Sequence, residues 1–448
     1  MRKLFGTDGI RGVANEYPLT IDLCKKLAEA ITLKYCETRE KKHTVIIGKD
    51  PRLSGDMFEH ALAAAFCSCG INVKLLGVVP TPAVSILTHN AKASMGIMVS
   101  ASHNLFYDNG IKLFNKFGLK LKDDEEAELE EIMEKKLPYC KAIKSDLGQV
   151  EYTPSALDTY CTRVRSSFGF RGMGKIVVDS ANGSFSHIAP DILKEFGFEV
   201  ISIHDSPNGI NINENCGATN PSILSEAVLY HKADLGIAFD GDGDRVILAD
   251  KNGKFLDGDH ILAILAQSCE SSEVVSTIMS NCSLEKYLSS INVRLVRTNV
   301  GDRYISDYMH HSDARFGAEL SGHIIIKSHA PTGDGLFAAL KVLEYLSQTP
   351  EVHPRLHFFE SYPTVSRNLC VLDKSVIHTP LLQSTIRKFE KQLGSCGKLV
   401  VRASGTESVI RILAEGQDQL ELEQIVNELS QIIIQTSPQS CENLPGKN

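Results

Sequence analysis

Three carboxylates at alternate positions make one short segment the strongest candidate for chemistry. Asp240, Asp242 and Asp244 are separated by single glycines and directly follow the apolar run Leu235–Phe239, which is typical of a buried strand. Residues two apart in extended chain point to one face, and the glycines permit a tight turn, so the three side chains can converge. Converging carboxylates repel one another unless a cation lies between them, and Mg²⁺ prefers oxygen ligands. The segment therefore predicts a magnesium site with positions left for water or a phosphate oxygen.

Two other interpretations of this segment compete with the magnesium site. A calcium EF-hand loop requires Gly at its sixth position and Glu at its twelfth, whereas Arg245 and Lys251 stand there. An acidic surface turn is the remaining alternative, although such turns seldom follow a fully apolar strand directly. If the ligand is a phosphate ester, cations and amide donors must come from other parts of the chain.

A serine beside a histidine is the second candidate. Ser102 and His103 follow the apolar run Met95–Val99, so they are expected at the carboxyl end of a strand, where a serine is a candidate nucleophile. A polar turn with a capping serine is the alternative. The segment has no G-x-S-x-G elbow, so a hydrolase triad is not favoured.

Three further segments have the side chains to bind a phosphate or a sugar. Residues 6–12 form a glycine-rich loop whose Arg11 could bind a phosphate or a carboxylate. An ordinary turn explains this segment at least equally well. Residues 319–323 place polar side chains at alternate positions, which suits a polyhydroxyl ligand or a polar edge strand. Residues 402–411 concentrate cations, hydroxyls and amides, as a phosphate cradle requires. The candidate ligands in the last two segments are Glu319, Ser321, His323, Arg402, Ser404, Gly405, Thr406 and Arg411.

Strands that alternate with helices must position these segments. Strands are expected at residues 44–47, 72–76 and 95–99, with an Ala-rich helix at 56–69. This rhythm predicts a mainly parallel sheet covered on both faces, with ligands outside the carboxyl ends of its strands. Asn252 and Gly253, just beyond the carboxylate strand, indicate a hairpin turn.

Composition narrows the class of protein. The 448 residues suffice for several domains, and 43% of them are hydrophobic, enough for substantial cores. A net charge of -8 without a basic block argues against nucleic-acid binding. The chain has no apolar signal region and no apolar run long enough to span a membrane. The 12 cysteines include no metal-type pair, which fits reduced thiols in a cytoplasmic protein.

These segments, in this order, resemble the α-D-phosphohexomutase superfamily over nearly the whole chain. The resemblance implies an α/β fold with a four-domain phosphohexomutase architecture, in which three related α/β mixed-sheet domains and a smaller α+β C-terminal domain surround a central cleft. The expected domains are a phosphoserine-bearing domain at 1–152, a metal-binding domain at 153–253, a sugar-binding domain at 254–362 and a phosphate-binding domain at 363–448.

The resemblance also implies roles for particular residues. Ser102 matches the phosphoserine, and it would share the Mg²⁺ ion with the three aspartates. Residues 319–323 match the sugar-binding loop, and the C-terminal candidates match the phosphate-binding loop. The candidates for charge stabilisation or proton transfer are His103, Lys112 and Arg245. The departures from the family pattern are Leu105 for Pro, Leu320 for Gln or Met, and Ser408 for Pro.

The implied reaction is an intramolecular phosphoryl transfer. Phosphorylated Ser102 would donate to a hexosamine monophosphate, and the resulting glucosamine 1,6-bisphosphate, an intermediate or activator, would turn over and return its other phosphate. Residues 5–9 and 211–217 resemble the branch that interconverts glucosamine 6-phosphate and glucosamine 1-phosphate, on the route to UDP-N-acetylglucosamine and peptidoglycan. The expected partner is a small-molecule phosphosugar, without nucleic acid or membrane, and a homodimer is an open alternative to a monomer.

Three other functions stay open at this point. A mutase of the same superfamily could act on glucose or mannose phosphates instead. A haloacid-dehalogenase-like phosphatase would use Asp242 as its nucleophile, but that class places its aspartyl loop after the first strand, not in mid-chain. A non-catalytic phosphosugar sensor would tolerate the loss of Ser102 or of an aspartate, and both are present.

Overall fold

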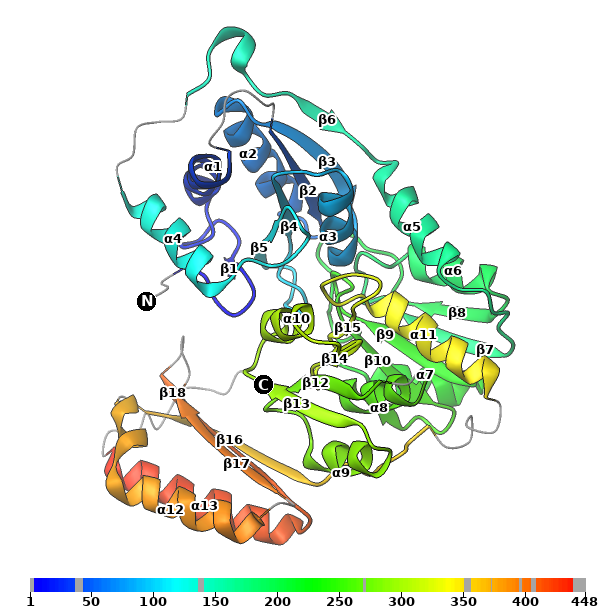
Figure 1. Cartoon of the computed structure of the whole chain (residues 1–448), viewed down its shortest axis with the longest axis vertical. Helices are drawn as coiled ribbons and strands as arrows, with labels where there is room; N and C mark the ends of the chain where they lie inside the picture. The colour runs from blue at the N-terminus through cyan, green and yellow to red at the C-terminus, as the bar shows by residue number, and fades with distance from the viewer. Residues whose placement is uncertain are drawn as a thin grey trace. The chain divides into compact units, whose positions relative to one another are not determined.

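A computed structural model describes the chain at residues 4–36, 43–135, 141–268, 271–349, 356–371, 373–394, 397–403 and 408–437. The chain divides into two compact units. The larger unit comprises Met1–Met279 and Val293–His357, and the smaller comprises Ser280–Asn292 and Phe358–Asn448. Each unit is described by itself below (Figure 1).

The first sheet of the larger unit has six strands in the order β1-β5-β4-β2-β3-β6. Strands β2, β3, β4 and β6 run parallel, whereas β5 runs antiparallel to both β1 and β4. The strands are β1 (Ile10–Val13), β2 (Thr44–Lys49), β3 (Asn72–Val78), β4 (Met95–Val99), β5 (Asp108–Asn115) and β6 (Val150–Tyr152). The sheet is therefore mixed but mainly parallel, as the sequence rhythm predicted, because β5 alone runs against the other five strands.

Four helices cover this sheet. They are α1 (Ile21–Tyr35), α2 (Gly55–Ser68), α3 (Thr81–Asn90) and α4 (Asp123–Glu134), and a short 3-10 helix, η1 (Lys144–Asp146), follows. Helices α1, α2 and α4 share one hydrophobic core with the sheet, whereas α3 packs on β2 and β4. Helix α1 begins where the Thr20 side chain accepts a hydrogen bond from the Leu23 amide, an ordinary N-cap. The glycine-rich loop predicted at 6–12 is shorter than expected, since Ile10 already begins β1.

The second sheet has five strands in the order β11-β10-β9-β7-β8. Strands β7, β8 and β9 are parallel, and β10 is antiparallel to β9 and β11. The strands are β7 (Lys175–Asp179), β8 (Glu199–Ile203), β9 (Leu235–Phe239), β10 (Val246–Asp250) and β11 (Phe255–Leu256), and the helices are α5 (Ala156–Ser166), α6 (Ile188–Glu195) and α7 (Ser222–His231). Gly253 has a φ of 76° in the turn between β10 and β11, so the predicted hairpin is confirmed.

The third sheet has four strands in the order β13-β12-β14-β15. Strand β12 is parallel to β13 and β14, and β15 is antiparallel to β14. The strands are β12 (Glu273–Thr277), β13 (Arg294–Thr298), β14 (Phe316–Ala318) and β15 (Ile324–Ile326), and the helices are α8 (Gly258–Ser268), α10 (Asp302–His310) and α11 (Gly335–Gln348). Asp334 caps α11 by accepting a hydrogen bond from the Phe337 amide.

The smaller unit is built on a three-stranded antiparallel sheet in the order β16-β18-β17. Helices α12 and α13 pack together and against these strands around one apolar core. The elements are α9 (Cys282–Ser290), β16 (Thr364–Cys370), η3 (Lys374–His378), α12 (Pro380–Leu393), β17 (Lys398–Ala403), β18 (Val409–Glu415) and α13 (Gln419–Thr436). Among the residues described in both units, no helix is long and apolar enough to cross a membrane.

Candidate functional site

The three aspartates lie in a tight turn between β9 and β10. The segment is a turn and not extended chain, since the Gly243 amide donates to the Asp240 carbonyl at 3.1 Å. Gly243 has a φ of 74°, and a Cβ there would lie 2.4 Å from the Phe185 ring, so only glycine fits. The three side chains nevertheless converge. Ligand atoms of Asp240, Asp242 and Asp244 lie within 4.8 Å of one another, and all three residues are buried.

Ser102 lies beside this cluster, where the family resemblance implied that it would be. It belongs to the Ser102 loop, residues 100–107, which joins β4 to β5. Its hydroxyl donates a hydrogen bond to Asp240 Oδ2 at 2.7 Å, and its side chain is fully buried. Ser102 has a φ of 54°, in the left-handed region that a residue with a side chain rarely adopts. The surrounding structure therefore holds the serine in a conformation that the isolated loop would disfavour.

Lys112 supplies a buried cation to the same cluster. Strand β5 carries it, and its Nζ lies 2.7 Å from Asp242 Oδ2, 2.9 Å from Asp244 Oδ2 and 3.0 Å from Asp8 Oδ2. Burial by itself would lower the pKa of Lys112, but the three carboxylates outweigh burial and raise it well above the ordinary value. Lys112 is therefore an ammonium ion at neutral pH.

The cluster keeps oxygen atoms that fit a divalent cation. Asp242 Oδ1 and Asp244 Oδ1 are buried and have no hydrogen-bond partner among the described residues. Burial, followed by the charges of Asp244 and Asp242, raises the pKa of Asp240 well above its usual value. The neighbouring carboxylates therefore repel the charged form of Asp240. Two of the three converging carboxylates thus keep a buried oxygen without a hydrogen bond, and this donor set suits Mg²⁺.

Two arginines and a histidine border the cluster. Arg245 Nε lies 3.9 Å from Asp240 Oδ2 and 3.8 Å from Asp244 Oδ1. Arg11, in β1, pairs with Asp8 at 2.7 Å. Burial, followed by repulsion from Arg245 and Arg11, lowers the pKa of His103 to about 4. Lys112 and Arg245 are therefore cations beside the carboxylates, whereas His103 is a neutral ring at neutral pH.

The candidate sugar-binding residues form a hairpin turn between β14 and β15. The expected extended segment is wrong, because the Gly322 amide donates to the Glu319 carbonyl at 2.9 Å and Gly322 has a φ of 89°. The three side chains therefore do not share one strand face. Ser321 is exposed and His323 is buried, while Glu319 is half-buried.

His323 links this turn to the aspartates. Its Nδ1 lies 3.6 Å from Asp244 Oδ1, and its Nε2 lies 3.1 Å from Asp302 Oδ2. Burial alone would lower the pKa of His323, but Asp302 and Asp244 raise it to about 10. The Gly333 amide also points at Nε2, at 2.9 Å, which favours the neutral ring. Two carboxylates outweigh one amide dipole, so the charged ring is the form that we infer.

Sequence reasoning missed three charged residues that surround this site. Asp8 contacts Lys112 and lies 2.6 Å from Lys120, which in turn lies 2.6 Å from Asp302. Asp302 follows β13 in a polar segment that carried no distinctive spacing. These residues come together only because distant segments of the chain pair, so no local sequence pattern indicated that they belong to the site.

The two C-terminal arginines lie opposite each other. Arg402 in β17 pairs in register with Arg411 in β18, so their side chains point to the same face of the antiparallel sheet. The two arginines therefore lie side by side although nine residues separate them in sequence. The predicted ligands Ser404, Gly405 and Thr406 lie outside the described residues.

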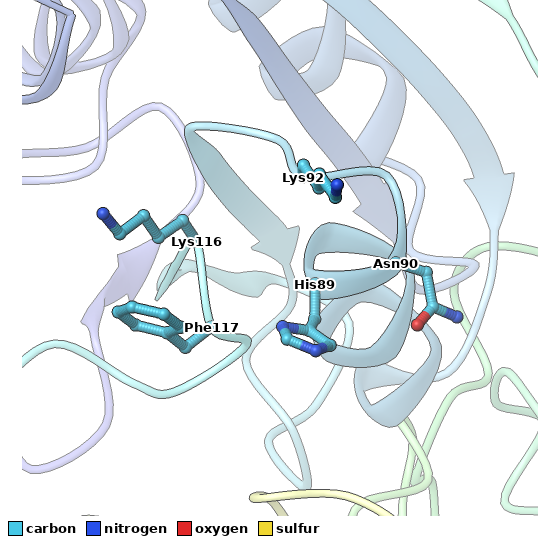
Figure 2. A pocket seen from close by; sticks show the side chains of 5 residues that line it. All are labelled: His89, Asn90, Lys92, Lys116 and Phe117. Carbon is cyan, nitrogen blue, oxygen red and sulfur yellow. The ribbon is translucent and has the colours of Figure 1, made fainter.

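Two other features of the larger unit lie outside this site. Ligand atoms of Asp179, His204 and Cys216 also lie within 4.8 Å of one another. Asp179 already accepts hydrogen bonds from the Ala181 and Gly217 amides, both at 2.9 Å. Its role is therefore to hold the loops that follow β7 and precede α7. A surface hollow at the end of α3 is lined by His89, Asn90, Lys92, Lys116 and Phe117 (Figure 2). None of its lining residues is a predicted site residue.

Comparison with known proteins assigns the chain to a family. Models of the phosphoglucomutase/phosphomannomutase family match it in four parts, the α/β/α domains I, II and III at residues 2–139, 156–253 and 257–361 and the C-terminal domain at 371–432. The phosphoglucosamine mutase of Gluconacetobacter diazotrophicus is 44% identical over 442 residues, which cover 96% of this chain and 98% of that protein. The chain belongs to the phosphoglucosamine mutase family. The phosphoglucosamine mutase of Rhizobium etli is 42% identical, with 96% of this chain and 97% of that protein covered.

Solved structures confirm the four-domain phosphohexomutase fold that the phosphoglucosamine mutase family shares. A phosphoglucomutase/phosphomannomutase family protein from Burkholderia thailandensis matches with a TM-score of 0.81 at 21% identity and covers 100% of both chains. The Aspergillus fumigatus N-acetylphosphoglucosamine mutase, solved in complex with GlcNAc-6P and magnesium, matches with a TM-score of 0.66 at 17% identity, covering 97% of this chain and 96% of that chain.

Proposed function

We propose that this protein is a phosphoglucosamine mutase, an isomerase that interconverts glucosamine 6-phosphate and glucosamine 1-phosphate through phosphorylated Ser102. The observation that carries the proposal is the buried Ser102 hydroxyl, which lies 2.7 Å from Asp240 within a cluster of three carboxylates. The relatives at 44% and 42% identity, both named phosphoglucosamine mutase, support the choice of sugar.

The aspartates are proposed to hold Mg²⁺ together with the Ser102 phosphate. The unpartnered Oδ1 atoms of Asp242 and Asp244 support this assignment. When bound, Mg²⁺ neutralises negative charge on the transferring phosphoryl group. Lys112 and Arg245 add positive charge from the protein, since both lie within 4 Å of the carboxylates.

Phosphoryl transfer exchanges one P–O bond for another. The bond from phosphorus to Ser102 Oγ breaks as a sugar hydroxyl oxygen bonds to phosphorus, and the hydroxyl proton must leave. Arg245 cannot lose a proton, and Lys112 is held as an ammonium by three carboxylates. His103 is the member of this group with proton-accepting capacity, and its buried Nδ1 has no hydrogen-bond partner among the described residues. We therefore assign the proton to His103 and charge stabilisation to the two cations.

The bisphosphate intermediate must turn over before the second transfer. Glucosamine 1,6-bisphosphate would return its other phosphate to Ser102 and leave the isomeric monophosphate. The remote phosphate needs an anchor, which we assign to Arg402, Arg411 and the residues 404–406. Arg11 and the turn that carries Glu319, Ser321 and His323 are assigned to the sugar and its phosphate.

The domains, the metabolic route and the cellular location are also inferred. We propose the four functional domains at 1–152, 153–253, 254–362 and 363–448, and a product that is consumed on the route to UDP-N-acetylglucosamine. The cysteines that support a reducing, cytoplasmic location as free thiols are Cys24, Cys67, Cys161, Cys216 and Cys370.

Direct observation of the sugar phosphates by ³¹P NMR tests the proposed function. With Mg²⁺ and a trace of hexose 1,6-bisphosphate, the wild-type protein should convert glucosamine 6-phosphate to glucosamine 1-phosphate, and EDTA should stop the conversion. A phosphatase would release inorganic phosphate instead, and a sensor would bind the sugar phosphate without changing it. Either of these results would contradict the proposal.

A further inference from the structure

A buried arginine outside the aspartate cluster binds the backbone of the Ser102 loop. The side chain of Arg52 is fully buried, and its Nε donates to Asp50 Oδ2 at 2.9 Å. One terminal nitrogen donates to the carbonyls of Ser102 at 2.9 Å and Asn104 at 2.7 Å. The other donates to the carbonyls of Leu105 and Asp108. The five donors of the guanidinium thus bind three carbonyls of the Ser102 loop, the carbonyl of Asp108 at the start of β5, and one carboxylate.

A second donor reaches the same carbonyls from the second sheet's connecting loop. Asn213 Nδ2 donates to the carbonyls of Ser102 and Asn104, both at 2.9 Å. Each of these carbonyls therefore accepts one hydrogen bond from Arg52 and one from Asn213. The amide orientation of Asn213 follows from its partners, because a flipped amide would set its oxygen against two carbonyl oxygens.

The backbone amide of Ser102 is held through Ser100 by Asp50, the carboxylate that also pairs with Arg52. The Ser102 amide donates to Ser100 Oγ at 2.8 Å, and Ser100 Oγ donates to Asp50 Oδ2 at 2.6 Å. Asp50 thus connects to the amide of Ser102 through Ser100 and to its carbonyl through Arg52. Both hydrogen-bonding groups of a residue with a φ of 54° are fixed, and this conformation directs Oγ to Asp240.

We propose that Arg52 and Asn213 are positioning residues for phosphoryl transfer at Ser102. The inference rests on the proposed function and adds the groups that hold the reacting oxygen in place. The role of Arg52 is to hold the Ser102 backbone in place, because Asp50 neutralises its charge and its other N–H groups donate to backbone carbonyls. Asn213 carries no charge and donates to two of the same carbonyls, those of Ser102 and Asn104, so loss of either side chain should slow the same step.

The test is the rate at which glucose 1,6-bisphosphate phosphorylates Ser102 in a single turnover. Arg52→Lys keeps a cation beside Asp50 but has one nitrogen, which cannot reach four carbonyls. Asn213→Asp keeps the size of the side chain but has no N–H to donate. We expect both variants to phosphorylate Ser102 ~10²-fold more slowly, because a displacement of about 1 Å has that effect on a positioned group. The dissociation constant of glucosamine 6-phosphate should stay at the wild-type value.

A matched control separates positioning from general damage to the fold. Arg163→Lys changes another arginine that donates to a backbone carbonyl, that of His329 at 2.6 Å, and it should phosphorylate Ser102 at the wild-type rate. If Arg52→Lys fails to fold, Asn213→Asp carries the test alone. Wild-type rates in the folded variants would overturn the positioning role. Absence of phosphorylation in the wild-type protein would instead contradict the proposed function.

Discussion

Replacement of Lys112 by Met removes the cation that lies among three buried carboxylates. The Nζ atom lies 2.7 Å from Asp242, 2.9 Å from Asp244 and 3.0 Å from Asp8, and its side chain is 1% exposed. Loss of one partner from a buried ion pair leaves the other charge buried and costs about 3–5 kcal/mol. In metal-free buffer, Lys112→Met should therefore lower the free energy of unfolding by about that amount.

The same substitution should strengthen Mg²⁺ binding while it weakens catalysis. Lys112 and a dication held by Asp242 and Asp244 repel each other, and two unit charges 4 Å apart interact by about 4 kcal/mol at an effective dielectric constant of 20. Because 1.4 kcal/mol corresponds to tenfold in affinity, partial relief of this repulsion should tighten Mg²⁺ binding at least ~10-fold. Turnover at saturating Mg²⁺ should fall ~10²-fold, as after loss of another group that stabilises developing charge.

Isothermal titration with Mg²⁺ and a turnover assay measure the two effects. Lys120→Met is the matched control, because Lys120 is a buried lysine that pairs with Asp8 and Asp302, both at 2.6 Å. The control should leave Mg²⁺ affinity closer to the wild-type value than Lys112→Met does. Weaker Mg²⁺ binding by Lys112→Met, together with full turnover, would refute the assignment of Lys112 to charge stabilisation at the metal site.

Three other predictions concern the remote anchor, the sugar and a pH-dependent contact. Arg411→Ala should weaken binding of both monophosphates ~10-fold or more, since hydrogen bonds to charged groups contribute about 1.5–3 kcal/mol, and added 1,6-bisphosphate should restore activity. An effect on only one monophosphate would contradict a shared anchor. Glucosamine phosphate should show a higher kcat/KM than glucose phosphate, and equal values would exclude discrimination by the turn that carries Glu319. Hydrogen bonding to Asp179 raises the pKa of His204, so the charged ring stabilises the fold below about pH 6.5, and this stabilisation is lost as pH rises through the raised pKa. The melting temperature of wild type should therefore exceed that of His204→Gln most at pH 6. A melting-temperature difference that grows towards pH 9 would contradict stabilisation by the charged ring.

The aspartate cluster and the nearby serine could be predicted from local sequence. Each follows a fully apolar strand, β9 or β4, and each is a short polar turn, so its position at the carboxyl end of a strand follows from the pattern alone. The pairing of Arg402 with Arg411 could also be anticipated, because a short connection between two strands returns the chain beside itself.

Contacts between distant segments could not be predicted in the same way. Lys112 reaches the aspartates because β5 runs antiparallel between β1 and β4, and no local pattern specifies that order. The alternating polar residues at 319–323 suggested extended chain, but Gly322 turns the backbone instead. Arg52 contacts carbonyl groups, which every residue carries, so its sequence context gave no indication of its partners.

Site-resolved mass spectrometry tests the central claim most directly. The protein is incubated with glucose 1,6-bisphosphate and Mg²⁺, digested and mapped, beside the Ser102→Ala variant. We expect one phosphoryl group, on Ser102, whose absence from Ser102→Ala accompanies loss of turnover. Full turnover by Ser102→Ala, or a phosphoryl group on a different residue of the active protein, would contradict it.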